Sequence, residues 1–544
     1  MKNFNLPFLY LIILYFLIPQ NELLHGQTTI TGFVFEDINK NSQFDIDEPG
    51  IGGVAVSNGL DVVRTDKNGA YSLPVDDETL IFISKPAEYD VPVDAFQIPQ
   101  FYYNHDADGS PDSIDFKFPV VEPTGKAPKS VNFPLIPASS EQRFRALAFA
   151  DPQAGTHVQL DYVRDDIIVE AAGYEADFAM VVGDLVNDNL ALFPRHLEIF
   201  AQLDIPVWNV PGNHDMNFQA PDDIHATETY ERYFGPTNYS FNYGDVHFIA
   251  MDNVQYKGID KGNYSGGSRY RGYLTDEQLQ WLDNDLEYIS EDKLVVLFTH
   301  IPLKTYAPSG GVVGGDNINT VNLRKLLKIL DRFEKVYSFS GHDTSNSWQI
   351  YFDQDYGRTA SRPIHHHIMA EVRGGSWQGA KNIFGIPDAT AEDGNPNGYY
   401  FIDFHGAEYI TKFKAAGYGD DYRMRIIIET GREYLENNRL SQSQLKHSRF
   451  LVNVFDGGKK WKVDYSLNGG SFSAMEYEQR PDPFVEHLLE MHREEETSIS
   501  INPSSHIWHA TMPKRLRQGA HSLTVQVTTP FDETFTGKLI FEVE

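Results

Sequence analysis

Side chains that can bind metals follow several apolar segments of this sequence, at the point where each segment ends. The apolar segment at 205–210 is followed by Gly212, Asn213, His214 and Asp215. Similar endings recur at Asp151 with Gln153, at Asp184 with Asn187 and Asp188 just beyond, at His300, and at His342 with Asp343. One such ending is ordinary turn chemistry, but the repetition indicates a site. Ligands of an α/β sheet bind at the carboxyl ends of its strands, so we expect these side chains to converge.

The residue types narrow the chemistry. Carboxylate, amide and imidazole groups without cysteine favour Mn, Fe or Zn, and suit Mg less well. Several carboxylates together predict two cations, which in hydrolytic sites lie roughly 3.5–4 Å apart. One carboxylate must then bridge the cations, and Asp184 is central in chain order.

The segments that carry these residues alternate between strand-like and helix-like patterns. Short apolar runs occupy 145–150, 177–183, 205–210, 246–251, 294–299 and 335–340, and helical periodicity appears at 276–290 and 321–334. This alternation predicts a layered α/β fold, in which helices flank β-sheets. Gly212 is expected to let the chain turn tightly beside the site.

Both ends of the chain read differently from its middle. Short alternating strands separated by turn signals occupy 28–83 and recur after Asp420, and a proline-rich linker or exit strand lies at 120–140. We therefore predict a small β-sandwich domain on each side of the α/β domain. The predicted boundaries are 27–140, 141–420 and 421–544.

Composition excludes several classes of protein. The 544 residues carry a formal net charge of −32, which disfavours binding to a nucleic-acid backbone. There is no cysteine, hence no disulfide, thiolate metal site or cysteine nucleophile. Lys2 and the apolar run from Leu6 to Ile18 indicate a signal peptide at 1–26 that is cleaved before Gln27, with an uncleaved membrane anchor as the alternative. We expect a periplasmic or extracellular protein whose mature chain has no membrane span.

Several motifs resemble a known family. The stretches FADPQ, VVGDLVND, VPGNHD, LFTHIP and FSGH are similar to the successive signatures of the calcineurin-like metallophosphoesterases, and the resemblance covers 143–415. The flanks, with HHHIMAEVRGGSW at 365–377 and SSHIWHATMP at 504–513, resemble a secreted bacterial branch with N-terminal and C-terminal β-sandwich domains.

This resemblance implies a role for each matching position. Two divalent metals, Mn, Fe or Zn, would be held by Asp151 and Gln153 at the first site and by Asn213, His300 and His342 at the second, with Asp184 bridging them. His214 would face a small phosphorylated substrate, and Asp215 would orient its imidazole. A metal-bridging hydroxide would attack phosphorus in line, so the resemblance implies a metal-dependent phosphoric ester hydrolase.

The sequence departs from the family pattern at the first metal. The family usually has Asp-x-His and Gly-His-x-His, but Gln153 and Thr344 replace the two imidazoles. Asp343 or one of His365, His366 and His367 would be needed to compensate. Two rival functions follow: a catalytically silent binding protein on the same fold, and a pyrophosphatase that acts on nucleotide-type substrates. No motif separates monoester, diester and pyrophosphate.

Two further groups of residues are candidate sites. If 365–367 is a strand, His365 and His367 share one face, where they either contact the substrate or form a polar edge. Trp377 either stacks on a ring of the substrate or packs against the protein. In the N-terminal part, an EF-hand-like loop predicts calcium binding, with a solvated acidic turn as the alternative. Its residues are Asp37, Asn39, Asn41, Gln43, Asp45 and Glu48.

Overall fold

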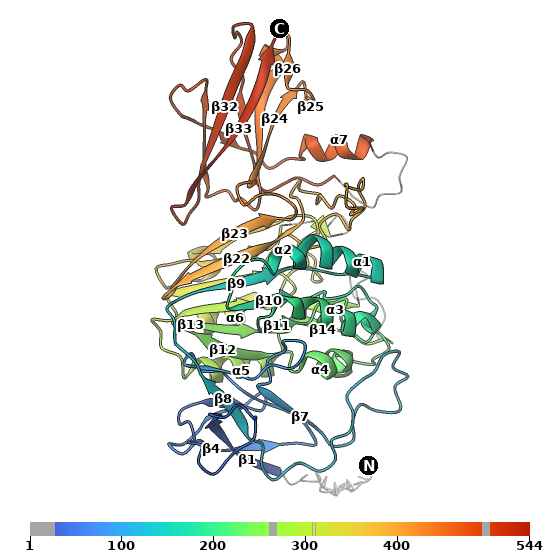
Figure 1. Ribbon diagram of the computed structural model, residues 1–544, viewed down its shortest axis with the longest axis vertical. Helices are drawn as coiled ribbons and strands as arrows, with labels where there is room; N and C mark the ends of the chain where they lie inside the picture. The colour runs from blue at the N-terminus through green and yellow to red at the C-terminus, as the bar shows by residue number, and fades with distance from the viewer. Residues whose placement is uncertain (1–27, 260–268, 307, 310–311, 492–500) are drawn as a thin grey trace, which may run out of the picture.

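The computed structural model describes residues 28–259, 269–306, 308–309, 312–491 and 501–544. Three parts are stacked along its long axis, with the N-terminal part at the bottom and the C-terminal part at the top of Figure 1. The predicted signal peptide at 1–26 lies outside the described residues. Among the helices of the described ranges, none has the length and apolar character needed to cross a membrane.

The N-terminal part contains two four-stranded sheets, ordered β4-β1-β8-β6 and β3-β2-β5-β7. The proline-rich stretch at 120–140 includes β8, which pairs in parallel with β1 and so belongs to the first of these sheets. The strands are β1 (Thr28–Glu36), β2 (Ala55–Ser57), β3 (Val62–Arg64), β4 (Ala70–Val75), β5 (Glu78–Ile83), β6 (Tyr89–Asp90), β7 (Tyr102–Asp106) and β8 (Phe133–Pro137).

The middle part is built on two larger sheets, which confirms the predicted layered α/β fold. The first has the order β11-β10-β9-β22-β23 and the second β12-β13-β16-β19-β21-β20. The first comprises β9 (Arg143–Phe149), β10 (Phe178–Val182), β11 (Val207–Val210), β22 (Gly398–His405) and β23 (Glu408–Ala415). The second comprises β12 (Tyr239–Tyr243), β13 (Val246–Ala250), β16 (Leu294–Phe298), β19 (Lys335–Ser340), β20 (Trp348–Phe352) and β21 (Ile364–Ile368). Two short hairpins lie outside them: β14 (Val254–Tyr256) with β15 (Tyr270–Gly272), and β17 (Pro308–Ser309) with β18 (Val312–Val313).

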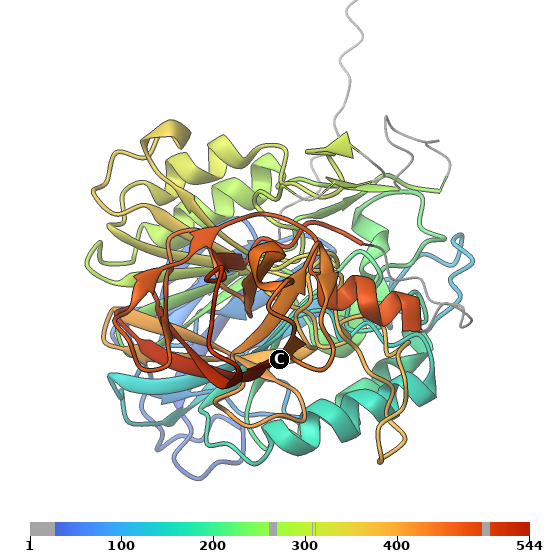
Figure 2. The same cartoon turned by 90° about the horizontal axis from the view of Figure 1, so that it is seen from above.

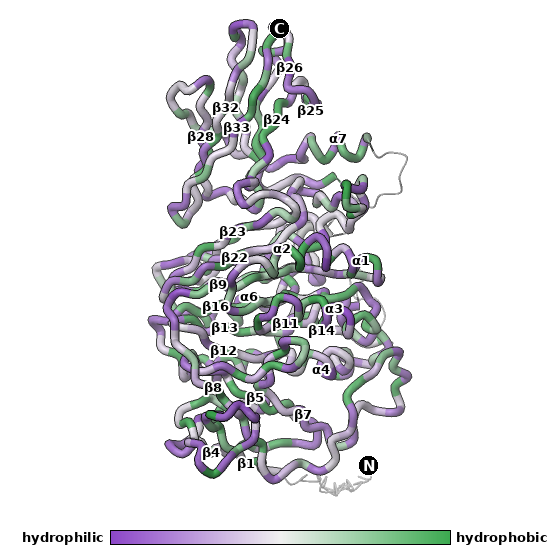
Figure 3. The backbone as a smooth tube through the Cα atoms, viewed as in Figure 1, coloured by the Kyte–Doolittle hydropathy of each residue, from purple (hydrophilic) through white to green (hydrophobic). Residues whose placement is uncertain are grey.

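Alternating residues of β9 explain how the layers pack. Ala146 and Ala148 belong to the core between the two sheets, whereas Leu147 and Phe149 belong to the core under the helices on the other face. Every residue of β10 and β16 is buried, as expected of strands covered on both faces. Seen from above, the teal helices and the yellow-green helices lie on opposite sides of the strands (Figure 2). Figure 3 shows apolar residues along central strands such as β13 and β16.

The helices begin where the sequence offers capping side chains. Thr275 and Gln278 form a capping box at the start of α5, and Thr156 caps α1. In α6 the leucines on one face are buried, as its periodicity predicts. The helices of the middle part are α1 (His157–Tyr162), continued by the π-helical η1 (Val163–Ile168) and α2 (Val169–Ala171), then η2 (Leu190–Leu192), α3 (Phe193–Phe200), η3 (Ala201–Leu203), η4 (Ile224–Ala226), α4 (Glu228–Phe234), α5 (Asp276–Leu286), α6 (Leu323–Leu330) and η5 (Gln354–Tyr356).

The topology brings the polar strand ends together. Strands β9, β10 and β11 run parallel in the first sheet, and β13, β16, β19 and β21 run parallel in the second. Their carboxyl ends therefore lie at the same edge of each sheet. The loops after β9, β10, β11, β16 and β19 carry all the predicted metal ligands.

The C-terminal part also contains two sheets, ordered β25-β24-β27-β31-β30 and β26-β33-β32-β28-β29. It contacts the middle part through Asp456, whose Oδ1 accepts hydrogen bonds from His367 at 2.7 Å and from the Tyr400 hydroxyl at 3.0 Å. Its elements are β24 (Met424–Thr430), β25 (Glu433–Tyr434), β26 (Arg439–Leu440), η6 (Leu445–His447), β27 (Ser448–Val454), β28 (Lys462–Leu467), β29 (Ser473–Ala474), β30 (Glu476–Tyr477), α7 (Pro483–Met491), β31 (Ile507–Thr511), β32 (Gly519–Thr528) and β33 (Thr534–Val543).

Candidate metal centre and active site

Asp184, His300 and His342 form the centre of the site. Each offers one ligand atom, and these atoms all lie within 4.8 Å of one another. His300 Nε2 lies 3.2 Å from Asp184 Oδ1 and 3.2 Å from His342 Nδ1. The other ring nitrogen of His300 donates to the carbonyl of Val182 at 2.8 Å. That bond fixes the tautomer and turns Nε2 toward the cluster, as in metal-binding histidines.

Asn213 completes this group, because its Oδ1 lies 3.0 Å from His300 Nε2. Asp184, Asn213, His300 and His342 are the four residues expected at the second metal. Asn213 and Asp184 are 2% and 1% exposed, so the cluster is removed from bulk water. The structure thus brings together these four predicted ligands from four different strand ends.

Asp151 and Gln153, the residues expected at the first metal, lie in the loop after β9, where the backbone N–H of Gln153 donates to the carbonyl of Asp184 at 2.8 Å. The backbone N–H of His342 donates to both carboxylate oxygens of Asp151, at 3.1 and 2.9 Å. Gln153 is 4% exposed, and among the described residues its buried Oε1 has no hydrogen-bond partner. A buried amide oxygen without a partner is costly. This amide oxygen, which is in the same loop as the Asp151 carboxylate, fits a ligand position for a hard cation.

Burial and mutual contacts shift the pKa values in this cluster in opposite directions. Burial, reinforced by Asp184, raises the pKa of Asp151 to about 7. Burial acts in the same direction on Asp184, but His300, His214 and His342 hold its pKa below the ordinary value. Burial favours a neutral His300, yet Asp184 and Asp151 raise its pKa to about 10. Burial and the neighbouring His300 lower the pKa of His342 to about 3. The negative charges of such a buried cluster are compensated only when protons or cations are bound to it.

The strand-end backbone is strained at the ligands. Asp151, Gln153, Asp184 and His342 have positive φ angles of 48°, 36°, 49° and 67°. Non-glycine residues rarely adopt this region, and such strain gathers at functional sites. The tight turn expected at Gly212 is present, because its carbonyl accepts the backbone N–H of Asp215 at 3.1 Å, although its φ is not positive. A Cβ there would lie 2.1 Å from the Asp184 backbone nitrogen and 2.2 Å from its Oδ1, so the close approach of two loops requires glycine.

The partner of His214 differs from the prediction. Its Nδ1 lies 2.6 Å from Asp188 Oδ1, and its Nε2 lies 4.0 Å from Asp184 Oδ2. Asp215 does not orient this ring: its carboxylate accepts the backbone N–H groups of Leu185, Val186 and Gly212 at 3.0, 3.1 and 2.8 Å. Asp215 therefore ties the loop after β11 to the loop after β10.

His214 combines burial with acidic neighbours. Burial lowers its pKa, but Asp184 and the hydrogen bond to Asp188 outweigh this and raise the pKa above the ordinary value. Its side chain is 29% exposed, whereas the His300 side chain is 0% exposed. His214 is therefore placed to reach a substrate at the edge of the cluster and to carry a proton there.

The residues expected to compensate at the first metal are engaged elsewhere. Asp343 accepts hydrogen bonds from Thr305 and Ser345, and Thr344 is exposed. His366 bridges the backbone N–H of Leu303 and the hydroxyl of Ser338.

The prediction of substrate contacts for His365 and His367 is wrong. Both rings are buried in β21, and both nitrogens of each ring have a partner. His365 contacts Tyr409 and Gln349 at 2.7 and 2.6 Å, and His367 contacts Tyr337 and Asp456 at 3.1 and 2.7 Å. His367 joins the middle part to the C-terminal part through Asp456, and the His365 ring centroid lies 6.2 Å from that of Phe531.

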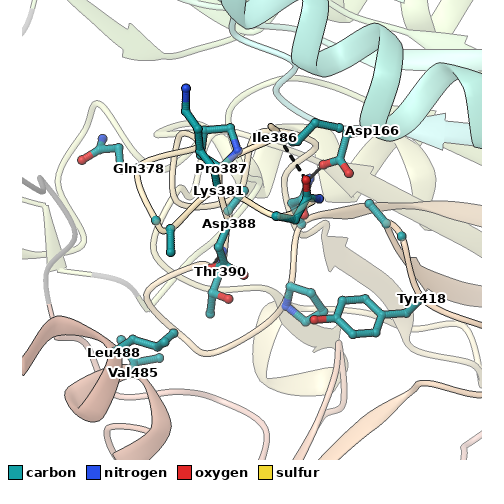
Figure 4. A pocket seen from close by; sticks show the side chains of 18 of the residues that line it. Asp166, Gln378, Lys381, Ile386, Pro387, Asp388, Thr390, Tyr418, Val485 and Leu488 are labelled. Atoms are coloured by element: carbon teal, nitrogen blue, oxygen red, sulfur yellow. Dashed lines mark hydrogen bonds between the residues drawn. The ribbon is translucent and has the colours of Figure 1, made fainter. Parts of the chain in front are cut away.

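Trp377 packs instead of facing the site. It is 5% exposed, its ring centroid lies 5.9 Å from that of Tyr162, and its Nε1 donates to Asp166 at 3.4 Å. Asp166 lines a cavity of about 540 Å³ between the 378–390 loop and α7 (Figure 4). Leu488 and Val485 of α7 form one wall of this cavity, and Tyr418 closes another side. Of the two readings of Trp377, the packing one holds.

The acidic loop of the N-terminal part holds itself together by hydrogen bonds. Asp37, which is 0% exposed, accepts the backbone N–H groups of Asn41 and Ser42, and Glu48 accepts those of Ile38 and Asp45. The side-chain amides of Asn39 and Asn41 donate to Asp45. Gln43 donates its backbone N–H to Asn41. Among the described residues, the group formed by Asp184, His300 and His342 is the one identified set of three acidic or histidine ligands. Calcium binding by this loop stays a prediction.

Sequence reasoning missed two residues near the first metal position. Glu371 is 3% exposed, and its Oε2 accepts from Arg373 Nε at 3.0 Å, whereas its Oε1 has no hydrogen-bond partner in the part of the chain that the structure describes. Burial, together with Asp151, raises the pKa of Glu371 well above the ordinary value. The signal was a charged pair in EVRGG directly after a strand.

Comparison with known proteins gives the family. Three profiles match: the calcineurin-like phosphoesterase at 144–345, the N terminal of calcineurin-like phosphoesterase at 38–120, and the C terminal of calcineurin-like phosphoesterase at 366–535. Together they cover the three parts seen in the structure.

Similar individual proteins were also found. The "probable glycerophosphodiester phosphodiesterase" of Arcobacter nitrofigilis is 24% identical over 179 residues, which are 30% of this chain and 56% of the relative. A 3',5'-cyclic-nucleotide phosphodiesterase of a Nostoc species is 24% identical over 200 residues, 37% of this chain and 64% of the relative. The chain thus spans less than two thirds of each relative. A purple acid phosphatase from yellow lupin (Lupinus luteus) seeds overlaps with a TM-score of 0.34 at 10% identity, covering 71% of this chain and 66% of the other.

The profile matches agree with the strand-end ligands and with the two flanking sheet-rich parts. The chain belongs to the calcineurin-like phosphoesterases and carries the N-terminal and C-terminal domains found in that family.

Proposed function

We propose that this protein is a metal-dependent phosphoester hydrolase. The observation that carries the proposal is the buried group of Asp184, Asn213, His300 and His342, which lies beside a partly exposed His214 paired with Asp188. The first set offers metal ligands, and the second offers a proton at the edge of the same site. A protein that only bound metal would need no such pair.

The residues present fit two divalent cations. Asp184, Asn213, His300 and His342 would hold one, and Asp151, Gln153 and Asp184 would hold the other with oxygen atoms alone. When bound, such cations lower the pKa of water and neutralise charge on a phosphoryl oxygen. Because its donors are oxygens, the first position favours a harder cation such as Mn over Zn.

The protein's own groups have distinct tasks in this proposal. His214 donates a proton from its imidazolium to the leaving oxygen of the ester. Asp188 keeps the Nδ1 proton in place and stabilises the positive ring, and Asp184 adds to this at 4.0 Å. Asp215 holds the two loops on which these residues stand. Other hydrogen-bond donors around the site would stabilise the remaining negative charge of the phosphoryl group.

A small phosphodiester is the substrate class that we infer first. The support comes from the names of two relatives, both phosphodiesterases, at 24% identity over part of the chain. A pyrophosphate bond in a nucleotide-type substrate is the competing candidate. A silent binding protein is favoured by Gln153 and Thr344, which leave the first position without an imidazole.

A substrate panel tests these alternatives. Protein saturated with Mn should hydrolyse bis(p-nitrophenyl) phosphate faster than p-nitrophenyl phosphate or a nucleotide sugar, and His300→Ala provides the background. Faster release of a nucleoside monophosphate from the nucleotide sugar would identify a pyrophosphatase. Hydrolysis of none of the three by metal-loaded protein would support the silent binding protein.

Export of the protein is a further part of the proposal, and it rests on the sequence of residues 1–26. In the native host, mass spectrometry should detect a mature chain that begins near Gln27 in the periplasmic or extracellular fraction. A chain that retains Met1 through Gly26 would contradict cleavage.

A further inference from the structure

Arg373 lies in the loop that follows β21 and runs beside the end of β9. The backbone N–H of Val372 donates to the carbonyl of Ala150 at 2.7 Å, and that of Arg373 approaches the carbonyl of Asp151 at 3.4 Å. The loop after β21 is therefore fixed against the first metal position, although none of the predicted ligands comes from it.

The guanidinium of Arg373 is held at one end only. Its Nε donates to Glu371 Oε2 at 3.0 Å, and Glu371 is itself 3% exposed. Within the described part of the chain, no hydrogen bond of its two terminal NH2 groups is found. The Arg373 side chain is 18% exposed, so these donors are partly sheltered but reachable. The buried Glu371 side chain thus holds the guanidinium of Arg373, whose terminal NH2 groups have no hydrogen-bond partner among the described residues.

The loop places Arg373 beside the first metal position, because its backbone N–H lies 3.4 Å from the carbonyl of Asp151. Acidic side chains lie beside Arg373, because Glu371 accepts from its Nε and Asp151 is adjacent in the neighbouring loop. Together with the bound cations and the His214 imidazolium, the guanidinium would offer an anionic substrate a further cationic contact.

We propose that Arg373 binds a phosphoryl oxygen of the substrate with its terminal NH2 groups, and that Glu371 is the positioning residue that holds the guanidinium. This rests on the proposed function. Guanidinium is suited to the task because its planar fork matches two oxygens of one phosphate group. Hydrogen bonds to charged groups are strong enough to change affinity about 10- to 100-fold.

Calorimetric titration of inorganic phosphate into Mn-loaded protein tests the contact without using activity. Arg373→Met should weaken phosphate binding about 10- to 100-fold, and Arg373→Lys should weaken it less, because the charge stays and the fork is lost. The control is Arg362→Met, an exposed arginine paired with Glu408 at 3.0 Å, which should bind phosphate like the wild type. Equal phosphate affinity in Arg373→Met and wild type would overturn the proposal.

Metal analysis separates the role of Glu371 from that of a ligand. Glu371→Gln should keep the metal content of the wild type and weaken phosphate binding, whereas loss of one metal equivalent would show that Glu371 is a ligand and overturn its assignment. With an ester substrate, Arg373→Met should raise KM more than it lowers kcat. If no ester is cleaved but phosphate still binds through Arg373, the proposed function fails and this inference stands. If esters are cleaved and Arg373→Met binds phosphate normally, only this inference fails.

Discussion

Replacing Asp188 by alanine should slow catalysis while leaving the fold and the metals in place. The Asp188 side chain is 55% exposed and contacts His214 at 2.6 Å, so its ion pair adds only about 0–1 kcal/mol to stability. Partners that orient a working histidine are typically worth about 10- to 100-fold in activity. We expect a fall in kcat of that size, or about 1.4–2.7 kcal/mol in the barrier.

Asp215→Ala should fail in a different way. It removes the acceptor of three buried backbone N–H groups, from Leu185, Val186 and Gly212. Each unsatisfied donor costs about 1–3 kcal/mol, so the loss is about 3–9 kcal/mol, a large part of the ~5–15 kcal/mol that stabilises a typical protein. Asp215→Asn keeps one acceptor oxygen and should lose less.

Three measurements on the two alanine variants separate these expectations. They are the unfolding midpoint in urea, the bound metal per chain, and the pH profile of kcat. Because Asp188 raises the pKa of His214, the alkaline limb of Asp188→Ala should move to lower pH if the imidazolium is the proton donor. The reasoning is refuted if Asp188→Ala loses metal or stability like Asp215→Ala, or if Asp215→Ala stays as stable as the wild type and loses only kcat.

Two other predictions concern the site, and a third concerns His196, a histidine of α3 that is 1% exposed. Asn213→Ala or His300→Ala should lower bound metal by about one equivalent, because each removes a direct ligand; unchanged metal content would contradict the assignment. Gln153→His should restore an imidazole at the first position and lower the Mn concentration needed for half-maximal activity, and an unchanged Mn titration would speak against a first metal there. Burial lowers the pKa of His196 from 6.5 to about 3. Between pH 6.5 and pH 3 the histidine is therefore protonated in the unfolded state and neutral in the folded state, so the free energy of unfolding falls as the pH drops through this range. His196→Phe should remove about 2 kcal/mol of that loss at pH 5, measured by urea unfolding at pH 7 and pH 5, and the same pH dependence as the wild type would count against it.

The ligands could be predicted because each depends on a local signal. An apolar strand that ends in Asp184 or His300 is readable in sequence, and parallel strands place such ends at one edge. The helix predicted at 276–290 was readable from its apolar periodicity, and the structure has α5 at Asp276–Leu286. Burial patterns with period two or 3.6 carry this information within a few residues.

The partners of these residues could not be predicted, because they depend on contacts between distant segments. Asp215 is adjacent to His214 in sequence, but the carboxylate that reaches the ring is Asp188, from another strand end. His365 and His367 do share a face, yet that face is covered by Asp456 and its neighbours from the C-terminal part. Alternation along a strand tells which residues lie together and not which side meets water.

The central claim is that metal bound at the strand ends makes this protein a phosphoester hydrolase. The most direct test follows hydrolysis of bis(p-nitrophenyl) phosphate while Mn is returned to chelator-treated protein, with bound Mn measured at each point for the wild type and His300→Ala. We predict that wild-type activity is absent without metal and rises with bound Mn, and that His300→Ala stays inactive at the same total Mn. Activity that persists in metal-free protein, or that is equal in the two proteins, would contradict the claim.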